Sequence, residues 1–216
     1  MLPPPLMNST PGSFAEHTIR VRKPGIIAKV LATQHYTPEI VAAVQRFGDE
    51  IREGVAAPLK EECADRPLWN RAFAPWEGKR WIELPWFLAE TYFYRRLLEA
   101  VRYFQPGPTY LLDPFEPQKR EAMGEGLAAT VRFYAGWHQE SALKDQFMLA
   151  MRRALWGNRA DLSNITVKGS SETDSDEQHR ILIDHRETVW DLLAAGRVRR
   201  LDYTADNSGP EILADM

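Results

Sequence analysis

The amphipathic pattern of residues 37–55, TPEIVAAVQRFGDEIREGV, most constrains what this chain can fold into. Four large apolar residues recur along it at the spacing of one helix face: Ile40, Val44, Phe47 and Ile51. Such a face has to be buried against other elements. Thr37 can cap the start of the helix, and Pro38 suits its first position because an N–H group there would be unpaired anyway. The pattern therefore predicts a helix inside a packed helical layer.

Helical patterns continue over most of the next hundred residues. One helix should start near Pro85 and run to Phe104, where the sequence QPGP at 105–108 would stop it. This helix is bulky on nearly every side, which indicates a buried position. Two further helices are expected within residues 113–137 and 141–156, although glycines weaken the first of them.

The character of the sequence changes after residue 167. Residues 168–180 are polar and acidic without periodicity, as in an exposed loop. The apolar run ILID at 181–184 and the run VRRLDYTA at 198–205 are typical of strands. A short helical pattern, ETVWDLLAA, separates them and should be closed by Gly196, and another helix should begin near Pro210. This order predicts the opening of a β-α-β unit.

We therefore expect an α+β, multidomain chain. A flexible N-terminal tail at 1–18 precedes an all-helical domain at 19–167, and the exposed loop at 168–180 leads into a Rossmann-like α/β domain at 181–216. Two strands and one helix cannot cover both faces of a parallel sheet, so we expect this α/β domain to be incomplete.

Composition excludes several classes of protein. The net charge of −3 gives no case for nucleic-acid binding, and no stretch reaches the roughly 18 apolar residues of a membrane span. A single cysteine, Cys63, excludes an internal disulfide and a thiolate zinc cluster, which favours a cytoplasmic location.

The stretch ADNSGPE at 205–211 follows the second expected strand. Asp206 and Asn207 offer hard oxygen ligands that suit Mg²⁺ or Mn²⁺, and ligands of open α/β sheets bind beyond the carboxyl ends of the strands. A helix that starts at Pro210 would present free N–H groups to a phosphate. The same four letters, DNSG, are also typical of a plain turn, so both interpretations stay open on these residues.

Several motifs together resemble the damage-control phosphatase family, which shares the acidic-residue methyltransferase 1-like metal-binding domain. They occur in the family's order: RPLWNRAFAPWEGKRWIELPWFLAETYFYRRLLEA, DPFEPQK, ALWGNRADLS, ILIDHRETVWDLL and RLDYTADNSGPE. The resemblance covers roughly residues 25–216 and is closest to the sugar-phosphate phosphatase subgroup.

The resemblance implies a helical domain followed by an α/β domain with a metal at its edge. It also implies hydrolysis of small phosphorylated metabolites, including hexose phosphates such as fructose 1-phosphate, with Mn²⁺, Co²⁺, Ni²⁺ or Mg²⁺. By motif match, Asp206 and Asn207 would hold the metal, contact the substrate and act in catalysis. The family's third metal aspartate and its Arg-Thr-x-Lys motif are absent from these 216 residues. The chain thus resembles the first half of a member, so we expect its phosphatase activity to be weak or absent without the second half. A missing or separately encoded C-terminal half is an expected partner.

Two alternatives remain from this resemblance. One is an S-adenosylmethionine-dependent protein-glutamate O-methyltransferase, in which Glu211 would contact the cofactor. The glycine-rich cofactor turn usual after a first strand is absent, which counts against it. The other alternative is a non-catalytic helical fragment.

Further candidates have structural interpretations beside functional ones. Asn158 and Asp161 could approach a cleft between domains or form a hinge. Arg95 and Arg96 could steer anionic substrates or be solvated charges of a helix. Four tryptophans could form a sugar-binding platform or pack the helical core: Trp69, Trp76, Trp81 and Trp86.

Overall fold

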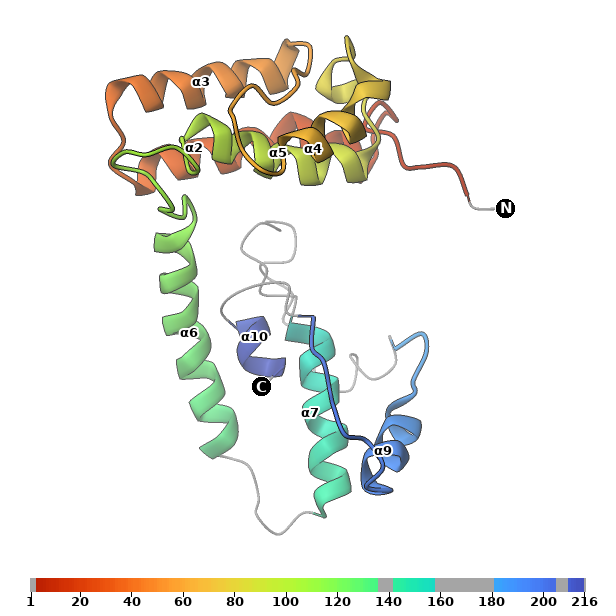
Figure 1. The fold of residues 1–216 in the computed structure, drawn as a ribbon. Helices are drawn as coiled ribbons and strands as arrows, with labels where there is room; N and C mark the ends of the chain where they lie inside the picture. The colour runs from red at the N-terminus through yellow and green to blue at the C-terminus, as the bar shows by residue number, and fades with distance from the viewer. Residues whose placement is uncertain (1–2, 136–141, 158–180, 205–209, 216) are drawn as a thin grey trace. The chain divides into compact units, whose positions relative to one another are not determined.

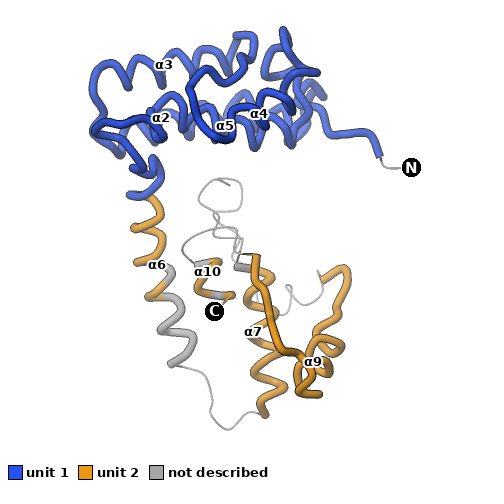
Figure 2. The backbone as a smooth tube through the Cα atoms, viewed as in Figure 1, with its two compact units in different colours: residues 1–117 blue, residues 118–216 orange. Residues whose placement is uncertain are grey.

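The computed structural model describes residues 3–135, 142–157, 181–204 and 210–215, which form helices joined by turns and extended segments (Figure 1). The chain divides into two compact units, Met1–Pro117 and Gln118–Met216, which we call unit 1 and unit 2 (Figure 2). The expected change of domain near residue 168 lies outside the described residues. Within the described part, no helix is both long and apolar enough to cross a membrane.

Unit 1 is built from helices that share one core. They are α1 (Phe14–His17), α2 (Lys23–Thr33), α3 (Pro38–Glu53), α4 (Arg66–Phe73) and α5 (Trp86–Ala100), with a π-helical segment at Thr18–Arg22 and short 3₁₀ turns at Ala74–Trp76 and Trp81–Glu83. Helix α3 packs against both α2 and α5. The start of unit 2's first helix, α6 (Glu116–Ala135), lies at the boundary between the units.

Helix α3 confirms the prediction made from its periodicity. All four residues of the predicted face are buried, at 3% exposure or less. Thr37 stands at the N-cap position with an extended backbone, as expected, but its hydroxyl accepts no capping hydrogen bond. Its carbonyl oxygen instead accepts the N–H of Val41 at 2.9 Å, so the helix begins without side-chain help.

Aromatic rings fill the centre of unit 1. The Tyr92 ring lies 5.0 Å from that of Phe73 and 5.9 Å from that of Trp81, and Phe47 stacks on Phe93 at 5.6 Å. Trp81 is fully buried. Such contacts stabilise a core beyond the apolar area that they bury. Of the two interpretations of Trp81, the structure supports core packing and not a sugar platform.

The segment expected to be a flexible tail makes specific contacts. Asn8 is fully buried, and its N–H group donates to the Leu84 carbonyl at 3.2 Å. The N–H of Trp86 donates to the Leu6 carbonyl at 2.8 Å. The Ser13 hydroxyl caps α1 by accepting the N–H of Glu16 at 3.1 Å. The first two bonds tie residues 6–8 to the chain just before and at the start of α5, and the third fixes the start of α1.

Helix α5 ends at Ala100, earlier than the predicted end at Phe104. The N–H of Tyr103 donates to the Leu98 carbonyl at 2.9 Å, and that of Arg102 donates to the Glu99 carbonyl at 3.0 Å. This bond pair is the Schellman motif, in which the residue after the C-cap turns left-handed. That residue is Arg102, with φ +58°. The prediction missed this helix end because glycine usually marks such an end in the sequence, whereas here the left-handed residue is an arginine.

Unit 2 contains α6, α7 (Leu143–Gly157), α9 (Arg186–Ala194) and α10 (Pro210–Asp215). Within it, α7 contacts both α9 and α10. The Phe147 ring of α7 lies 5.5 Å from the Trp190 ring of α9. Gly196, with φ +64°, follows α9 and closes it as its sequence predicts.

The predicted fold class is wrong for the described residues. Neither 181–184 nor 198–204 forms a strand, and the described part of the chain contains no sheet, only the isolated bridges Met7–Pro85 and Val55–Arg80. The expected opening of a Rossmann-like α/β domain is therefore not observed, and the described chain is mostly helical. A strand needs the N–H and C=O groups of a neighbouring strand, and neither segment has such a neighbour among the described residues.

Candidate functional site

The predicted metal and catalytic residues, Asp206 and Asn207, lie outside the described residues. The secondary candidates Asn158 and Asp161 also lie outside them. The structure therefore neither brings these four side chains together nor separates them. What it does describe are the helices that flank both segments, α7 before residue 158 and α10 after residue 209, and these two helices pack against each other (Figure 1).

The segment before the DNSG sequence is described as far as Thr204. It is largely exposed and contains an exposed ion pair between Arg200 and Asp202, with 2.7 Å between Nε and Oδ1. Helix α10 then starts at Pro210, as predicted. It is only six residues long, too short for the cooperative dipole of a regular helix. We therefore do not assign a phosphate site to its N-terminus.

Glu211 is the one predicted site residue whose side chain is described. It lies in the first turn of α10 and is 9% exposed. Burial to this degree is explained by the packing of α10 on its neighbours and does not by itself indicate a bound ligand. Its expected contact with S-adenosylmethionine stays a prediction.

The start of α9 is fixed by a local pair of charged residues. Asp184 accepts from the backbone N–H of Arg186 at 3.1 Å and from its guanidinium at 2.6 Å. The guanidinium also donates to the Met148 carbonyl of α7 at 3.1 Å. The hydrogen bonds from Arg186 lower the pKa of Asp184 to about 2. Asp184 therefore stays ionised at neutral pH and orients the Arg186 side chain, which bonds α9 to α7.

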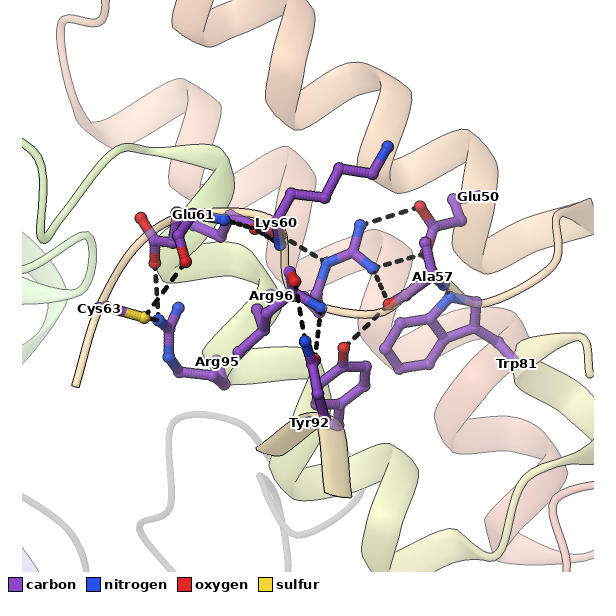
Figure 3. Close-up of polar contacts among 12 residues, drawn as sticks. Glu50, Ala57, Lys60, Glu61, Cys63, Trp81, Tyr92, Arg95 and Arg96 are labelled. Atoms are coloured by element: carbon purple, nitrogen blue, oxygen red, sulfur yellow. Dashed lines mark hydrogen bonds and ion pairs between the residues drawn. The ribbon is translucent and has the colours of Figure 1, made fainter. Parts of the chain in front are cut away.

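A second polar cluster lies in unit 1, in the irregular segment 55–65 and the helices beside it (Figure 3). Arg96 pairs with both oxygens of Glu50, at 3.2 and 3.0 Å, and its Nε lies 3.0 Å from Glu99. Its Nη1 also donates to the Ala57 carbonyl. Glu50 accepts the indole N–H of Trp81 at 3.0 Å as well.

The carboxylates of this cluster also bind the backbone of segment 55–65. Glu99 accepts the N–H groups of Lys60 and Glu61, at 2.6 and 2.9 Å. The Tyr92 hydroxyl donates to the Ala57 carbonyl at 2.9 Å (Figure 3). A segment without secondary structure has to satisfy its backbone groups elsewhere, and side chains of α3 and α5 do this.

Arg95 fixes the next part of the same segment. It donates to both oxygens of Asp65, at 2.8 and 3.1 Å, and its Nη2 lies 2.7 Å from Glu61. The same nitrogen donates to the Cys63 sulfur at 2.8 Å. The hydrogen bond from Arg95 lowers the pKa of Asp65, whereas burial raises the pKa of the Cys63 thiol. Cys63 is therefore a poor nucleophile.

Both interpretations of Arg95 and Arg96 made from the sequence are wrong. The two residues are buried, at 4% and 9% exposure, and engaged in ion pairs. They are neither solvated charges nor free to bind a substrate anion. The sequence gives little sign of this, because all of their carboxylate partners except Glu99 come from α3 and segment 55–65, far away along the chain.

The described residues contain no group of three or more His, Cys, Asp or Glu side chains that could hold a metal. The carboxylates of the unit 1 cluster are occupied by arginines or by backbone N–H groups. Asp206 and Asn207 therefore remain the candidates for metal binding, on the chemistry of their oxygen atoms.

Comparison with known protein families matches residues 18–216 to the damage-control phosphatase ARMT1-like domain. Among curated proteins, the chain is 28% identical over 250 residues to the mouse damage-control phosphatase ARMT1, a match that covers 95% of this chain and 56% of the relative. It is 28% identical to the Macaca fascicularis protein and 27% identical to the zebrafish protein of the same name, over all of this chain and 59% and 58% of theirs. The chain thus spans less than two thirds of the length of these relatives.

Proposed function

This chain belongs to the damage-control phosphatase ARMT1-like domain family, and from that membership we propose that it takes part in metal-dependent hydrolysis of phosphorylated metabolites. The family match over residues 18–216, which includes the DNSGPE motif, is the observation that carries the proposal. The family resemblance read from the sequence is thereby confirmed. The substrate class that we propose is hexose phosphates, such as fructose 1-phosphate.

Asp206 and Asn207 would hold the divalent cation, which we propose to be Mn²⁺, Co²⁺, Ni²⁺ or Mg²⁺. A carboxylate and a carboxamide oxygen suit these hard ions, and water and substrate oxygens commonly complete their coordination. When bound, such an ion polarises a phosphoryl group and lowers the pKa of a bound water. The chain's own contribution is to hold the ion and, through it, to orient the phosphate of the substrate.

The chain can also be tested for dependence on a complementary segment. The relatives' proteins extend well beyond the length that this chain covers, and we propose that a separately supplied C-terminal half is the partner that completes the site. We then expect this chain to bind the metal by itself through Asp206 and Asn207, whereas turnover of substrate requires the C-terminal half as well.

The experiment separates metal binding from turnover. Calorimetric titration of the full chain with Mn²⁺ should show binding that Asp206→Asn weakens by at least tenfold, the effect of losing a charged ligand. The matched control is Asp202→Asn, an exposed aspartate shortly before the motif, which should bind Mn²⁺ like the parent. Equal affinity in Asp206→Asn and the parent chain would overturn the metal assignment.

Phosphate release from p-nitrophenyl phosphate and fructose 1-phosphate is measured in parallel. With the C-terminal half of a relative added, we expect turnover that requires Mn²⁺ and is lost in Asp206→Ala; with this chain alone we expect weak turnover or none. Turnover that persists in excess chelator would contradict a metal-dependent reaction. We do not propose the methyl-transfer alternative, because its one described residue, Glu211, is a buried residue of α10.

A further inference from the structure

An open pocket of about 610 Å³ lies in unit 1, beside α3, segment 55–65 and the C-terminal end of α5. Its volume is within the range of about 300–1,000 Å³ usual for small-molecule sites. Its lining is highly charged, with the cations Arg46, Lys60, Arg96 and Arg102 and the carboxylates Glu50, Glu61 and Glu99. None of these residues belongs to a site predicted from the sequence as metal-binding or catalytic.

The negative charges of this pocket are already occupied. Glu50 and Glu99 bind Arg96 and the backbone of segment 55–65. Glu61 pairs with Arg95. Arg96 is therefore a fixed part of the pocket floor, and these carboxylates are not free to pair with the cations at its rim.

The three cations at the rim are exposed and lack a carboxylate of their own. Within the described part of the chain, Arg46, Lys60 and Arg102 form no side-chain ion pair within 4 Å. Figure 3 shows the Lys60 side chain extending beyond the bonded network. The pKa of the exposed Glu39 is lowered mainly by a hydrogen bond from Thr37, and Arg102 is the weakest of the causes.

A second pocket of unit 1 shows that unpaired charge is not a general property of the surface arginines in this unit. That pocket has about 340 Å³ and is also lined by three arginines. Each of them is paired with a carboxylate three or four residues away: Arg20 with Glu16, Arg52 with Asp49, and Arg80 with Glu83. A pocket whose arginines are locally neutralised has little attraction for an anion, so the two pockets differ in the charge that they present.

The backbone at Arg102 supplies an independent observation. It occupies the left-handed position of the Schellman motif, at φ +58°, where glycine is the usual residue. A residue with a Cβ atom is strained in this conformation. Strain of this kind concentrates at ligand sites, where the side chain itself is needed. Here the strained residue is a cation at the rim of the pocket.

We propose that Arg46, Lys60 and Arg102 form a binding site in unit 1 for a small phosphate-bearing anion. Guanidinium groups bind phosphate oxygens through paired N–H donors, and a lysine adds a mobile point charge. Arg96 forms part of the pocket floor, where its ion pairs with Glu50 and Glu99 hold it in place. The site goes beyond the proposed metal function, since it uses neither Asp206 nor Asn207.

The test is calorimetric titration of the full chain with inorganic phosphate, against chloride at the same ionic strength. We expect Arg102→Gly and Arg46→Gln each to weaken phosphate binding about tenfold, and the triple variant with Lys60→Gln to abolish it. The matched control is Arg52→Gln in the other pocket, which should bind phosphate like the parent. Arg102→Lys should retain most of the affinity, because it keeps the charge.

The substitution Arg102→Gly also separates binding from folding. Glycine is the usual residue at that position, so the melting temperature of this variant should equal or exceed that of the parent. Unchanged phosphate affinity in the triple variant, or equal loss in Arg52→Gln, would overturn the proposal.

Titration with fructose 1-phosphate distinguishes two sources of the phosphate group. If Arg102→Gly weakens its binding, the pocket takes the phosphate of a sugar phosphate. If only Asp206→Asn weakens it while inorganic phosphate still depends on Arg102, the pocket takes a different phosphorylated ligand. Both results support the phosphate site in unit 1. Neither depends on the outcome of the Mn²⁺ titration, which tests Asp206 and not the residues of this pocket.

Discussion

Helices α3 of unit 1 and α7 of unit 2 carry the same pattern, four large apolar residues at nearly four-residue steps, yet they meet different environments. In α3 all four are buried. In α7 the equivalent outer residues, Leu143 and Leu155, are 70% and 57% exposed. Periodicity thus tells which residues share a face, whereas burial depends on which elements cover that face.

The charged residues of the two units differ in the same way. Unit 1 buries Arg95, Arg96 and Lys23 among carboxylates and aromatic rings. The described ion pairs of unit 2, such as Arg200 with Asp202, are largely exposed. We therefore expect the folding free energy to be concentrated in unit 1, and three sets of variants test this from the largest effect to the smallest.

Phe93→Ala in α5 should give the largest loss of stability. The residue is fully buried and stacks on Phe47, so removing its ring should lower the free energy of unfolding by about 3–5 kcal/mol. Leu192→Ala in unit 2, at 59% exposure, should change it by less than about 0.5 kcal/mol. Urea unfolding followed by tryptophan fluorescence measures both.

Phe87→Ala is the control within the same helix, because Phe87 is 71% exposed. It should behave like Leu192→Ala. A comparable loss in Leu192→Ala and Phe93→Ala would show that the two units contribute equally, contrary to the comparison above.

Arg96→Met should cost about 2–4 kcal/mol, since it leaves Glu50 and Glu99 partly buried without their cation. The corresponding change in unit 2 is Arg200→Met, which breaks an exposed pair and should cost about 0–0.5 kcal/mol. Chemical denaturation at low and high salt measures the two losses. Strong salt dependence of the Arg96→Met loss would argue that this pair is solvated after all.

Lys23 should make the stability of unit 1 depend on pH. It is fully buried, its Nζ lies 2.7 Å from Glu90, and the rings of Phe93 and Tyr94 lie 4.4 Å from it. Burial lowers the pKa of Lys23 from 10.5 to about 8, against the opposing attraction of Glu90. Between these values the unfolded chain binds more protons than the folded one, so the free energy of unfolding rises with pH.

From pH 8 to pH 9.5 this rise should amount to about 2 kcal/mol for the single group. Lys23→Met should remove it, whereas Lys29→Met, at an exposed position of the same helix α2, should keep it. Above pH 10 the sign reverses, because burial raises the pKa of Tyr36 and Tyr92 to about 12. Urea unfolding at several pH values measures the slope, and an identical slope in Lys23→Met would refute this origin.

Much of the helical structure could be predicted from the sequence. The buried face of α3, the start of α5 after Pro85, the start of α10 at Pro210 and the closing glycine of α9 are confirmed. Each of these depends on contacts between residues a few positions apart, which a short stretch of sequence contains. The two predicted strands failed because ILID and VRRLDYTA show only a local preference, and pairing is decided elsewhere.

The candidate sites likewise include one part that the sequence could predict and one part that it could not. The letters DNSGPE and the order of the motifs were enough to indicate the family, which the comparison confirms. The cations of the unit 1 pocket were missed, since no spacing relates Arg46, Lys60 and Arg102. The one local signal among them is the left-handed backbone of Arg102 just after α5. A sequence normally marks such a helix end with glycine, and here the residue is arginine.

The sequence by itself determined where most helices form, which residues of α3 face inward and which family the chain belongs to. Tertiary structure alone decided that Arg95 and Arg96 are buried, that residues 181–184 and 198–204 do not pair as strands, and which cations of unit 1 remain without carboxylates. The reason is the range of the interactions. Helical hydrogen bonds join residues four apart, whereas strand pairing and the neutralisation of a buried charge need partners that only the folded chain brings near.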